Sequence, residues 1–420
     1  MRVRVLERVA GAEEAWLLAA TVTLSRLVVW AASLWAIVSI GILGSARLPL
    51  DPAQATEPFS SPTANLLFAP AARYDSVWYL AIAHSGYQIR PEMAFFPLYP
   101  LLMRVGGWVL GSTLVAGTLV SLVAMGVACR VLLALTRLEL GRPAGVLAVL
   151  LLVFFPTSLF LSAVYTESLF LALSVGAVYA ARRERWWLAG LLGGFASATR
   201  STGLLLLVPL LWMFLYGPRA AAQLAPAGRR AWRPRYRLSW SVAWLGLVPT
   251  GALAYLGWLA LRHGAGLAPF QVEHYWGRTF TGPFGGLIRA VRHLPSTVRR
   301  VLGGHEQRFV VGAPLGWQAY QLIDFGYLLF AVGGLWQCWR RLPRAYFAYA
   351  LVLCCQALSY PTPFDPMESF PRYLLLVFPV FMAWGGALAR RPLARGVAVA
   401  GLGAGLVVCS GLWGIWAWVA

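Results

Sequence analysis

The chain of 420 residues is much more apolar than a soluble globular domain. Hydrophobic residues make up 59% of it before glycine is counted, and charged residues only 12%, against about 45–50% and about 25% in soluble domains. The formal net charge of +20 comes from arginine alone, because the sequence contains no lysine. In so apolar a chain, arginines between hydrophobic runs are topology signals. These quantities exclude a soluble enzyme and a nucleic-acid partner, and they predict an all-α polytopic membrane protein.

Apolar runs divide the chain into eleven candidate spans, each measured against the roughly 20 residues that cross a bilayer. They lie at about 16–43, 113–135, 144–161, 166–181, 186–199, 201–217, 240–262, 317–337, 345–360, 372–388 and 396–418. The first run is too long for the apolar core of a signal peptide and lacks a clean cleavage site, so we expect a retained span. We therefore predict a single domain, residues 1–420, with about 10–11 transmembrane helices.

The arginines between these runs predict which side each connection faces. Six connections hold 20 of the 35 basic residues, namely 1–15, 136–143, 182–185, 218–238, 338–344 and 389–395. By the positive-inside rule they face the cytoplasm, which leaves two long outer loops, 44–95 and 263–316. Residues 96–111 are apolar, but counting them as a full span would invert every later loop. We expect that segment to be re-entrant or shallow.

Two acidic residues on the predicted outer side are candidates for chemistry. Asp75 lies in ARYDSVWYLAIAHSGYQ, a stretch that predicts a short amphipathic helix with its aromatics at the membrane interface. Either Asp75 carries out catalysis there or it caps the helix. Glu167 lies between two apolar runs, where an ionisable residue is functional by default, or it is the first-turn residue of a helix capped by Thr166. Asp324, inside a predicted span, raises the same question, with a hydrogen-bonded structural role favoured.

Three arginines break the positive-inside pattern on the same side. Arg200 separates two apolar runs in SATRSTG, Arg372 opens a run in ESFPRYLLL, and Arg278 lies in HYWGRTF. Each is either an anchor that extends its side chain to the interface or, paired with outer carboxylates or a lipid phosphate, part of a phosphate clamp. The clamp is the favoured reading for Arg200 and Arg372.

Four motifs in order carry a family resemblance: RYDSVWYLAIAHSGYQ, AFFPLYPLL, FPTSLFLSAVYTESLF and ASATRSTGLLLLVP. The chain resembles the glycosylphosphatidylinositol mannosyltransferase II-like family and its bacterial relatives, which are multi-span glycosyltransferases with the GT-C fold. The resemblance covers most of the first 215 residues and continues more faintly through FQVEHYWGRTF and PRYLLLVFPVF. It implies that Asp75 lies near the catalytic centre and that the donor is a polyprenyl-phosphate sugar. Arg73, Tyr74 and His274, which lie in the same motifs, become candidates for substrate contact.

The expected reaction is an inverting sugar transfer at the extracytoplasmic face of the cell membrane. Its leaving group is already a phosphate, so one carboxylate, Asp75, suffices as the base, and arginine stabilises the departing charge. No DxD or carboxylate cluster is present, so we expect no metal and no cofactor. The partners expected are the polyprenyl-phosphate donor, the lipid bilayer and an acceptor glycan or glycolipid. Alternatives are a transporter or flippase of lipid-linked sugars, which would carry midplane charges and an inverted repeat, and a non-catalytic scaffold.

Overall fold

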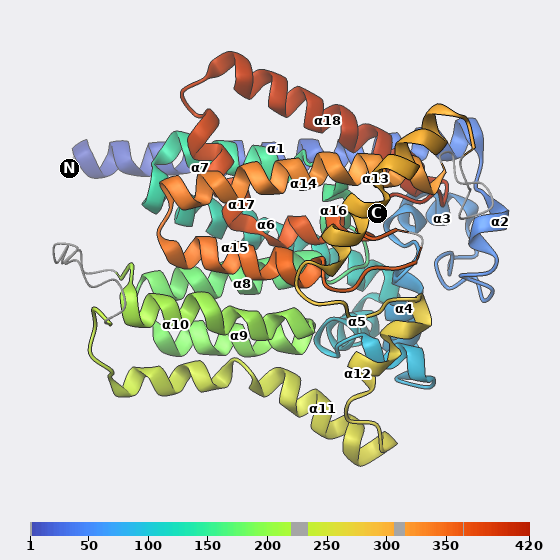
Figure 1. Ribbon diagram of the computed structural model, residues 1–420, viewed down its shortest axis with the longest axis horizontal. Coiled ribbons are helices and arrows are strands. Elements are labelled where there is room, and N and C mark those ends of the chain that lie inside the picture. The colour runs from blue at the N-terminus through green and yellow to red at the C-terminus, as the bar shows by residue number, and fades with distance from the viewer. Residues whose placement is uncertain (1, 220–233, 306–315, 364) are drawn as a thin grey trace.

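The computed structural model describes residues 2–219, 234–305, 316–363 and 365–420, which form helices and connections with no strand (Figure 1). The α-helices are α1 Arg2–Ile40, α2 Gly44–Arg47, α3 Pro62–Phe68, α4 Ser76–Ser85, α5 Leu98–Leu110, α6 Thr113–Leu140, α7 Arg142–Val153, α8 Glu167–Arg182, α9 Trp186–Thr199, α10 Leu207–Tyr216, α11 Thr250–His263, α12 Ala268–Gln271, α13 Gly285–Leu302, α14 Trp317–Arg341, α15 Arg344–Ala357, α16 Phe370–Tyr373, α17 Phe378–Leu388 and α18 Pro392–Gly414. Short 3-10 helices are η1 Ala69–Ala71, η2 Arg90–Ala94, η3 Pro156–Leu161, η4 Ser201–Leu206, η5 Trp240–Leu247, η6 Val272–Trp276 and η7 Leu374–Leu376. The predicted all-α class is confirmed.

Within the described residues, four helices are long and apolar enough to cross a membrane by themselves, at Trp16–Ile40, Thr113–Leu140, Gln318–Arg341 and Pro392–Gly414. Two bent pairs, η5 with α11 and α16/η7 with α17, raise the number to six. The protein is therefore a polytopic membrane protein, but at most six of the eleven predicted spans meet the length and hydropathy that a crossing helix requires. The remaining apolar runs form shorter helices.

Specific residues end the short helices, and burial within the protein makes the irregular backbone at these ends stable. Gly141, at φ +89°, ends α6 and starts α7 in a backbone conformation that favours glycine. Pro156 opens η3, because proline cannot continue the α-helical hydrogen bonding of α7. The side chains of η3 from Thr157 to Leu161 are all buried. Irregular backbone at membrane depth is stable where protein surrounds it, as it does here.

A buried arginine fixes η3 against α1. The guanidinium of Arg26 donates to the hydroxyl oxygens of Ser25, Ser158 and Ser162, and to the carbonyl oxygens of Ser158 and Val153, at 2.6–3.2 Å. These five bonds use all five N–H groups of the side chain. The charge therefore lies within the bundle without exposing an unsatisfied donor to lipid, and it holds the segment that leads into α8.

Different elements lie at the two ends of the helical bundle (Figure 1). The N-terminal end of α1 and the connections α14–α15 and α17–α18, which are rich in arginine, lie at one end. The helices α2 to α5, α12 and α13 gather at the opposite end. This separation matches the sorting that the arginine pattern predicts. Residues 220–233 and 306–315, which fall within the predicted inner loop 218–238 and outer loop 263–316, lie outside the described residues.

The first predicted outer loop is largely helical. Its α4 confirms the predicted short helix, but Tyr79, one of the aromatics expected at the membrane interface, is only 6% exposed and packs edge-on against Phe95 and Tyr99. Leu80, Ile82 and Ala83 of α4 are buried too. The helix therefore packs within the protein interior.

Residues 96–111, which the sequence predicts to be re-entrant or shallow, contain α5. Its 13 residues extend about 20 Å, which is less than the roughly 30 Å of a bilayer's hydrocarbon core. α5 turns back at Gly111, at φ +72°, and packs against α6. This geometry agrees with the predicted shallow segment.

Candidate active site

A cavity of about 310 Å³ opens among the helix ends that gather with α4, α5 and α12. Its walls come from the start of α4, the start of α8, the junction of α9 with η4, the η6 region and α16. Seven acidic or basic residues line it, namely Asp75, Glu167, Arg200, Glu273, Arg278, Glu368 and Arg372. The structure thus brings five of the predicted site residues into one cavity, although they lie almost 300 positions apart in sequence.

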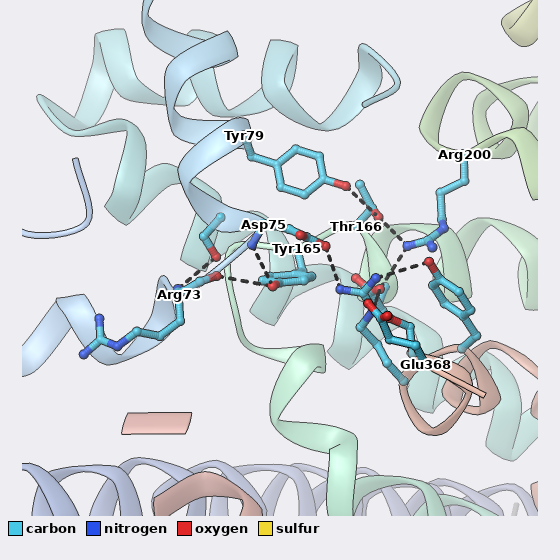
Figure 2. A network of polar contacts seen from close by, with 12 residues as sticks. Arg73, Asp75, Tyr79, Tyr165, Thr166, Arg200 and Glu368 are labelled. Atoms are coloured by element: carbon cyan, nitrogen blue, oxygen red, sulfur yellow. Dashed lines mark hydrogen bonds and ion pairs between the residues drawn. The ribbon is translucent and has the colours of Figure 1, made fainter. Parts of the chain in front are cut away.

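Asp75 is aimed at this cavity by the chain on either side of it. Tyr74 has φ +50°, a left-handed conformation rare for a large side chain, and so turns the backbone sharply before α4. The Asp75 N–H then donates to the Tyr165 hydroxyl at 3.0 Å, which in turn donates to the Arg73 carbonyl at 3.2 Å (Figure 2). A local turn and a long-range contact together therefore fix the position of Asp75.

The Asp75 carboxylate does not cap α4, although Asp75 occupies the N-cap position. Its Oδ2 instead accepts a hydrogen bond from Nη1 of Arg372 at 2.7 Å. The Asp75 side chain remains 31% exposed, whereas that of Arg372 is 8% exposed. The Asp75 side chain thus does not cap α4, and its carboxylate is accessible from the cavity.

Glu167 is the first residue of α8 and is fully buried. Its Oε1 lies 2.9 Å from Nη1 of Arg200 and 3.5 Å from Nε of Arg372. The Thr166 hydroxyl does not cap the helix but accepts from the same Arg200 Nη1 at 2.9 Å and contacts the Tyr79 hydroxyl at 3.3 Å (Figure 2). The Glu167 Oε2 is buried and has no hydrogen-bond partner. One oxygen is therefore committed to two arginines, and the other can accept from a ligand.

Arg278 supplies a third guanidinium to the wall. It donates to the hydroxyls of Tyr373 and Ser369 at 3.2 and 3.1 Å and forms looser ion pairs with Glu273 at 3.8 Å and Glu368 at 3.6 Å. Burial by itself lowers the pKa of Arg278, but its anionic and phenolic neighbours outweigh burial and raise the pKa above the ordinary value. Arg278 is therefore permanently charged.

One tyrosine hydroxyl joins two of the arginines. The Tyr373 oxygen accepts from Nη1 of Arg278 and from Nη2 of Arg372, each at 3.2 Å. The two guanidinium groups are thus close neighbours. The Nε of Arg278 is buried without a hydrogen-bond acceptor, whereas the Nε of Arg372 lies 3.5 Å from Glu167 Oε1 in an ion pair. A buried donor without a partner is costly. The Nε–H of Arg278 is therefore a candidate donor to an anion in the cavity.

Three of the predicted contact residues point elsewhere. The Arg73 guanidinium is fully buried and donates to the carbonyls of Ala69, Ala72 and Gly414, away from the cavity (Figure 2). The Tyr74 hydroxyl donates to the Trp416 carbonyl at 2.7 Å. His274 is exposed and bonds through Nδ1 to the Gln271 carbonyl. None of these three lines the cavity, and Arg73 and Tyr74 instead hold the turn that carries Asp75.

Sequence reasoning missed residues that act through hydroxyls. Tyr165 and Tyr373 organise Asp75 and the arginines respectively, although each directly neighbours or nearly neighbours a residue singled out from the sequence. The aromatic wall was missed as well: Trp276 lies edge-on to Phe95 and Trp78, at centroid distances of 5.9 and 6.3 Å. The adjacency of Tyr165 to Thr166–Glu167 and of Tyr373 to Arg372 was the signal available for the two tyrosines.

A carboxyl pair lies beside the cavity but does not line it. Asp324 of α14 and Asp365 share a side-chain hydrogen bond, and both are buried. Asp365 Oδ1 also accepts from the Met367 N–H at 3.1 Å. Burial raises the pKa of Asp365 to about 7, because the charged form is poorly solvated there. The pair thus gives Asp324 the hydrogen-bonded role that the sequence favoured.

Comparison with known proteins supports the resemblance seen in the motifs. The family model described as Mannosyltransferase (PIG-V) matches residues 17–216, which include Asp75, Glu167 and Arg200. A GPI alpha-1,6-mannosyltransferase 2 from Mus musculus is 34% identical over 188 residues, covering 42% of this chain and 37% of the relative. A GPI mannosyltransferase 2 from Cryptococcus neoformans is 29% identical over 214 residues, covering 48% and 49%.

The chain therefore spans less than half the length of these curated relatives. Arg278 and Arg372 lie beyond the matched residues, so their place in the site rests on the structure alone. Residues 17–216 thus match the model of the mannosyltransferase (PIG-V) family, in agreement with the resemblance carried by the sequence motifs.

Proposed function

We propose that this protein transfers a mannosyl group from a polyprenyl-phosphate donor to a hydroxyl group of a lipid, glycan or protein acceptor, at the extracytoplasmic face of the cell membrane. The single observation that carries the proposal is the accessible carboxylate of Asp75, held 2.7 Å from Arg372 at the wall of a cavity lined by three arginines. The match of residues 17–216 to a mannosyltransferase family model supports mannose as the sugar.

In the proposed reaction, Asp75 accepts the proton of the acceptor hydroxyl while the acceptor oxygen bonds to the anomeric carbon. The bond from that carbon to the phosphate oxygen breaks, and polyprenyl phosphate leaves with the electron pair. An exposed carboxylate whose second oxygen is free of Arg372 is suited to this task. The ion pair with Arg372 at 2.7 Å holds this carboxylate in position at the cavity wall.

The leaving phosphate gathers negative charge as the bond breaks. The unpartnered Nε of Arg278 and the neighbouring guanidinium of Arg372, brought together by Tyr373, are suited to that charge. The unpartnered Oε2 of Glu167 can accept from a sugar hydroxyl, and Trp276 with Phe95 supplies an apolar wall against which a sugar face packs. These groups position the reactants, and positioning contributes much of the rate enhancement.

The test is transfer by the purified protein reconstituted in vesicles. Radiolabelled polyprenyl-phosphate mannose is supplied with a membrane lipid and glycan extract, and the labelled product is identified. We expect Asp75→Asn to abolish transfer while folding is retained. Glu57→Gln is the matched control, because Glu57 pairs with Arg47 at 3.0 Å at the same end of the bundle but does not line the cavity.

Two results would overturn the proposal. Turnover retained in Asp75→Asn would remove Asp75 from the role of base. Movement of the labelled donor across the membrane without formation of any mannosylated product would instead identify a transporter or flippase of lipid-linked sugars.

A further inference from the structure

The helix α13 has a sharply divided surface that the proposed reaction does not use. Ile288, Val291, Pro295, Val298 and Leu302 recur at spacings of three and four residues and so form one stripe along the helix. Arginines 289, 292, 299 and 300 lie on the flank between this stripe and the face packed on the bundle, and residues 285–302 contain no acidic residue. The helix is therefore both amphipathic and strongly basic.

The apolar stripe is not buried in the protein. Ile288 is 49% exposed, Val291 52%, Val298 37% and Leu302 83%. The residues that do face the bundle are small, since the buried positions of α13 are Gly286, Ala290 and Thr297. The helix thus presents three faces: one against the bundle, one apolar and open, and one carrying arginine.

α13 is fixed at the boundary of the bundle by both of its ends. Near its start, the Gly286 N–H donates to the carbonyl of Leu358, the residue that ends α15, at 2.8 Å. Near its end, the Thr297 hydroxyl donates to Oε1 of Gln321, in the second turn of α14, at 2.7 Å. The last residues of α15 and the first residues of α14 therefore lie at the same end of the bundle, and α13 crosses from one to the other (Figure 1).

The anchor on α14 places this helix relative to the membrane. Gln318–Arg341 of α14 is long and apolar enough to cross a bilayer, and Gln321 is close to its start. A helix bonded there lies at the level where hydrocarbon gives way to headgroups. An apolar stripe beside a row of arginines is the pattern of a helix that lies in this interface.

We propose that α13 is an interfacial helix whose arginines bind the headgroups of anionic phospholipids while its apolar stripe enters the bilayer. The positive charge of α13 favours anionic headgroups as its binding partner. Arg292, Arg299 and Arg300 are exposed and form no ion pair within the described part of the chain. A basic side chain at an anionic surface gains roughly fivefold in local affinity. A zwitterionic surface offers no such net attraction, and the proposal does not depend on mannosyl transfer.

The test measures the depth of α13 in lipid nanodiscs that contain the full chain. A nitroxide is attached to a cysteine introduced by Val291→Cys on the apolar stripe, or by Ser296→Cys on the polar flank, with the labelled native chain as the blank. Collision with oxygen and with a water-soluble nickel complex reports depth. We expect position 291 to lie about 5–10 Å inside the interface and position 296 to be accessible to nickel.

The dependence of the depth of α13 on anionic lipid distinguishes electrostatic attraction of its arginines from burial of its apolar stripe. Phosphatidylglycerol added to phosphatidylcholine discs should deepen position 291. Replacing Arg292, Arg299 and Arg300 together by Gln should abolish this response. The equal charge change at Arg390, Arg391 and Arg395, at the opposite end of the bundle, should leave it intact.

Three results would overturn the proposal. In the first, positions 291 and 296 are equally accessible to nickel in both lipid mixtures, so that no stripe enters the bilayer. In the second, position 291 is shielded from oxygen and nickel alike, so that a second copy or another protein covers the stripe. In the third, the response to phosphatidylglycerol survives the loss of the three arginines of α13, so that they do not bind the lipid.

Discussion

Replacing Glu167 by Gln tests whether the cavity is held together by a shared carboxylate. The substitution preserves shape but removes the negative charge that faces Arg200 at 2.9 Å and Arg372 at 3.5 Å. Arg372 retains Asp75, but Arg200 retains no other carboxylate partner among the described residues. Both guanidinium groups would then face each other across a fully buried amide.

The expected loss of folding stability follows from the burial of Glu167. Removing one partner of a buried ion pair destabilises a protein by about 3–5 kcal/mol, because the remaining charge is left uncompensated. Glu167 is fully buried and serves two arginines, so we expect a value within that range. A typical native state is stable by only about 5–15 kcal/mol. The same change at Glu57, which is 20% exposed and pairs with Arg47 alone, should cost less than the change at the fully buried Glu167.

The assay is a double-mutant cycle measured by detergent-induced unfolding. Glu167→Gln, Arg200→Gln and the double variant are compared, and we expect the double variant to be more stable than the two single losses together predict, by at least about 1 kcal/mol. Asp75→Asn should lack such a loss, because Asp75 is partly exposed. Additive effects of the two substitutions, or a stability of Glu167→Gln equal to that of Glu57→Gln, would refute the reasoning.

Three further measurements address the donor, the topology and pH. Arg372→Ala should weaken use of the polyprenyl-phosphate donor more than it disturbs folding; unchanged donor affinity would contradict the clamp. Cysteine labelling should place Ser60 outside and both Arg390 and Ala227, the latter outside the described residues, inside, and same-side labelling would overturn the topology. The pKa of Asp365 is raised to about 7 from an ordinary 3.8, so the folded state binds a proton that the unfolded state releases between these values. Stability from this group should be full below about pH 4 and be lost as pH rises to about 7; Asp365→Asn should therefore gain melting temperature relative to the native chain between pH 5 and pH 8, and an unchanged difference would contradict the shift.

The class of fold was predictable because hydropathy is a property of composition and of runs of residues. The eleven apolar runs all correspond to helices, and the arginine pattern separates the two ends of the bundle. Helix length was less predictable. Pro156 breaks one run and the chain bends by 76° between η7 and α17, and the sequence does not show that surrounding protein makes such breaks tolerable.

Individual site residues were predictable when their environment was local. Asp75, Glu167 and Arg200 were singled out because a charge amid apolar residues demands a partner, and each has one in the structure. Which carboxylate meets which arginine depends on contacts between α4, α8 and the segment around Arg372, which no local pattern encodes. Arg73 illustrates the limit: it adjoins the site in sequence, yet its side chain turns to the carbonyl of Gly414.

The charges in the cavity suggest how it discriminates between donor and product. Four carboxylates line it against three arginines, so net positive charge does not attract a phosphate, and Arg278 and Arg372 must bind it in competition with carboxylates already in place. In the proposed reaction, such competition would weaken binding of the released polyprenyl phosphate and so favour turnover. Glu368→Gln removes one competitor, 3.6 Å from Arg278. If the ion pair is worth about 1 kcal/mol, product inhibition by polyprenyl phosphate should tighten about fivefold, and weaker inhibition would show that Glu368 assists rather than opposes phosphate binding.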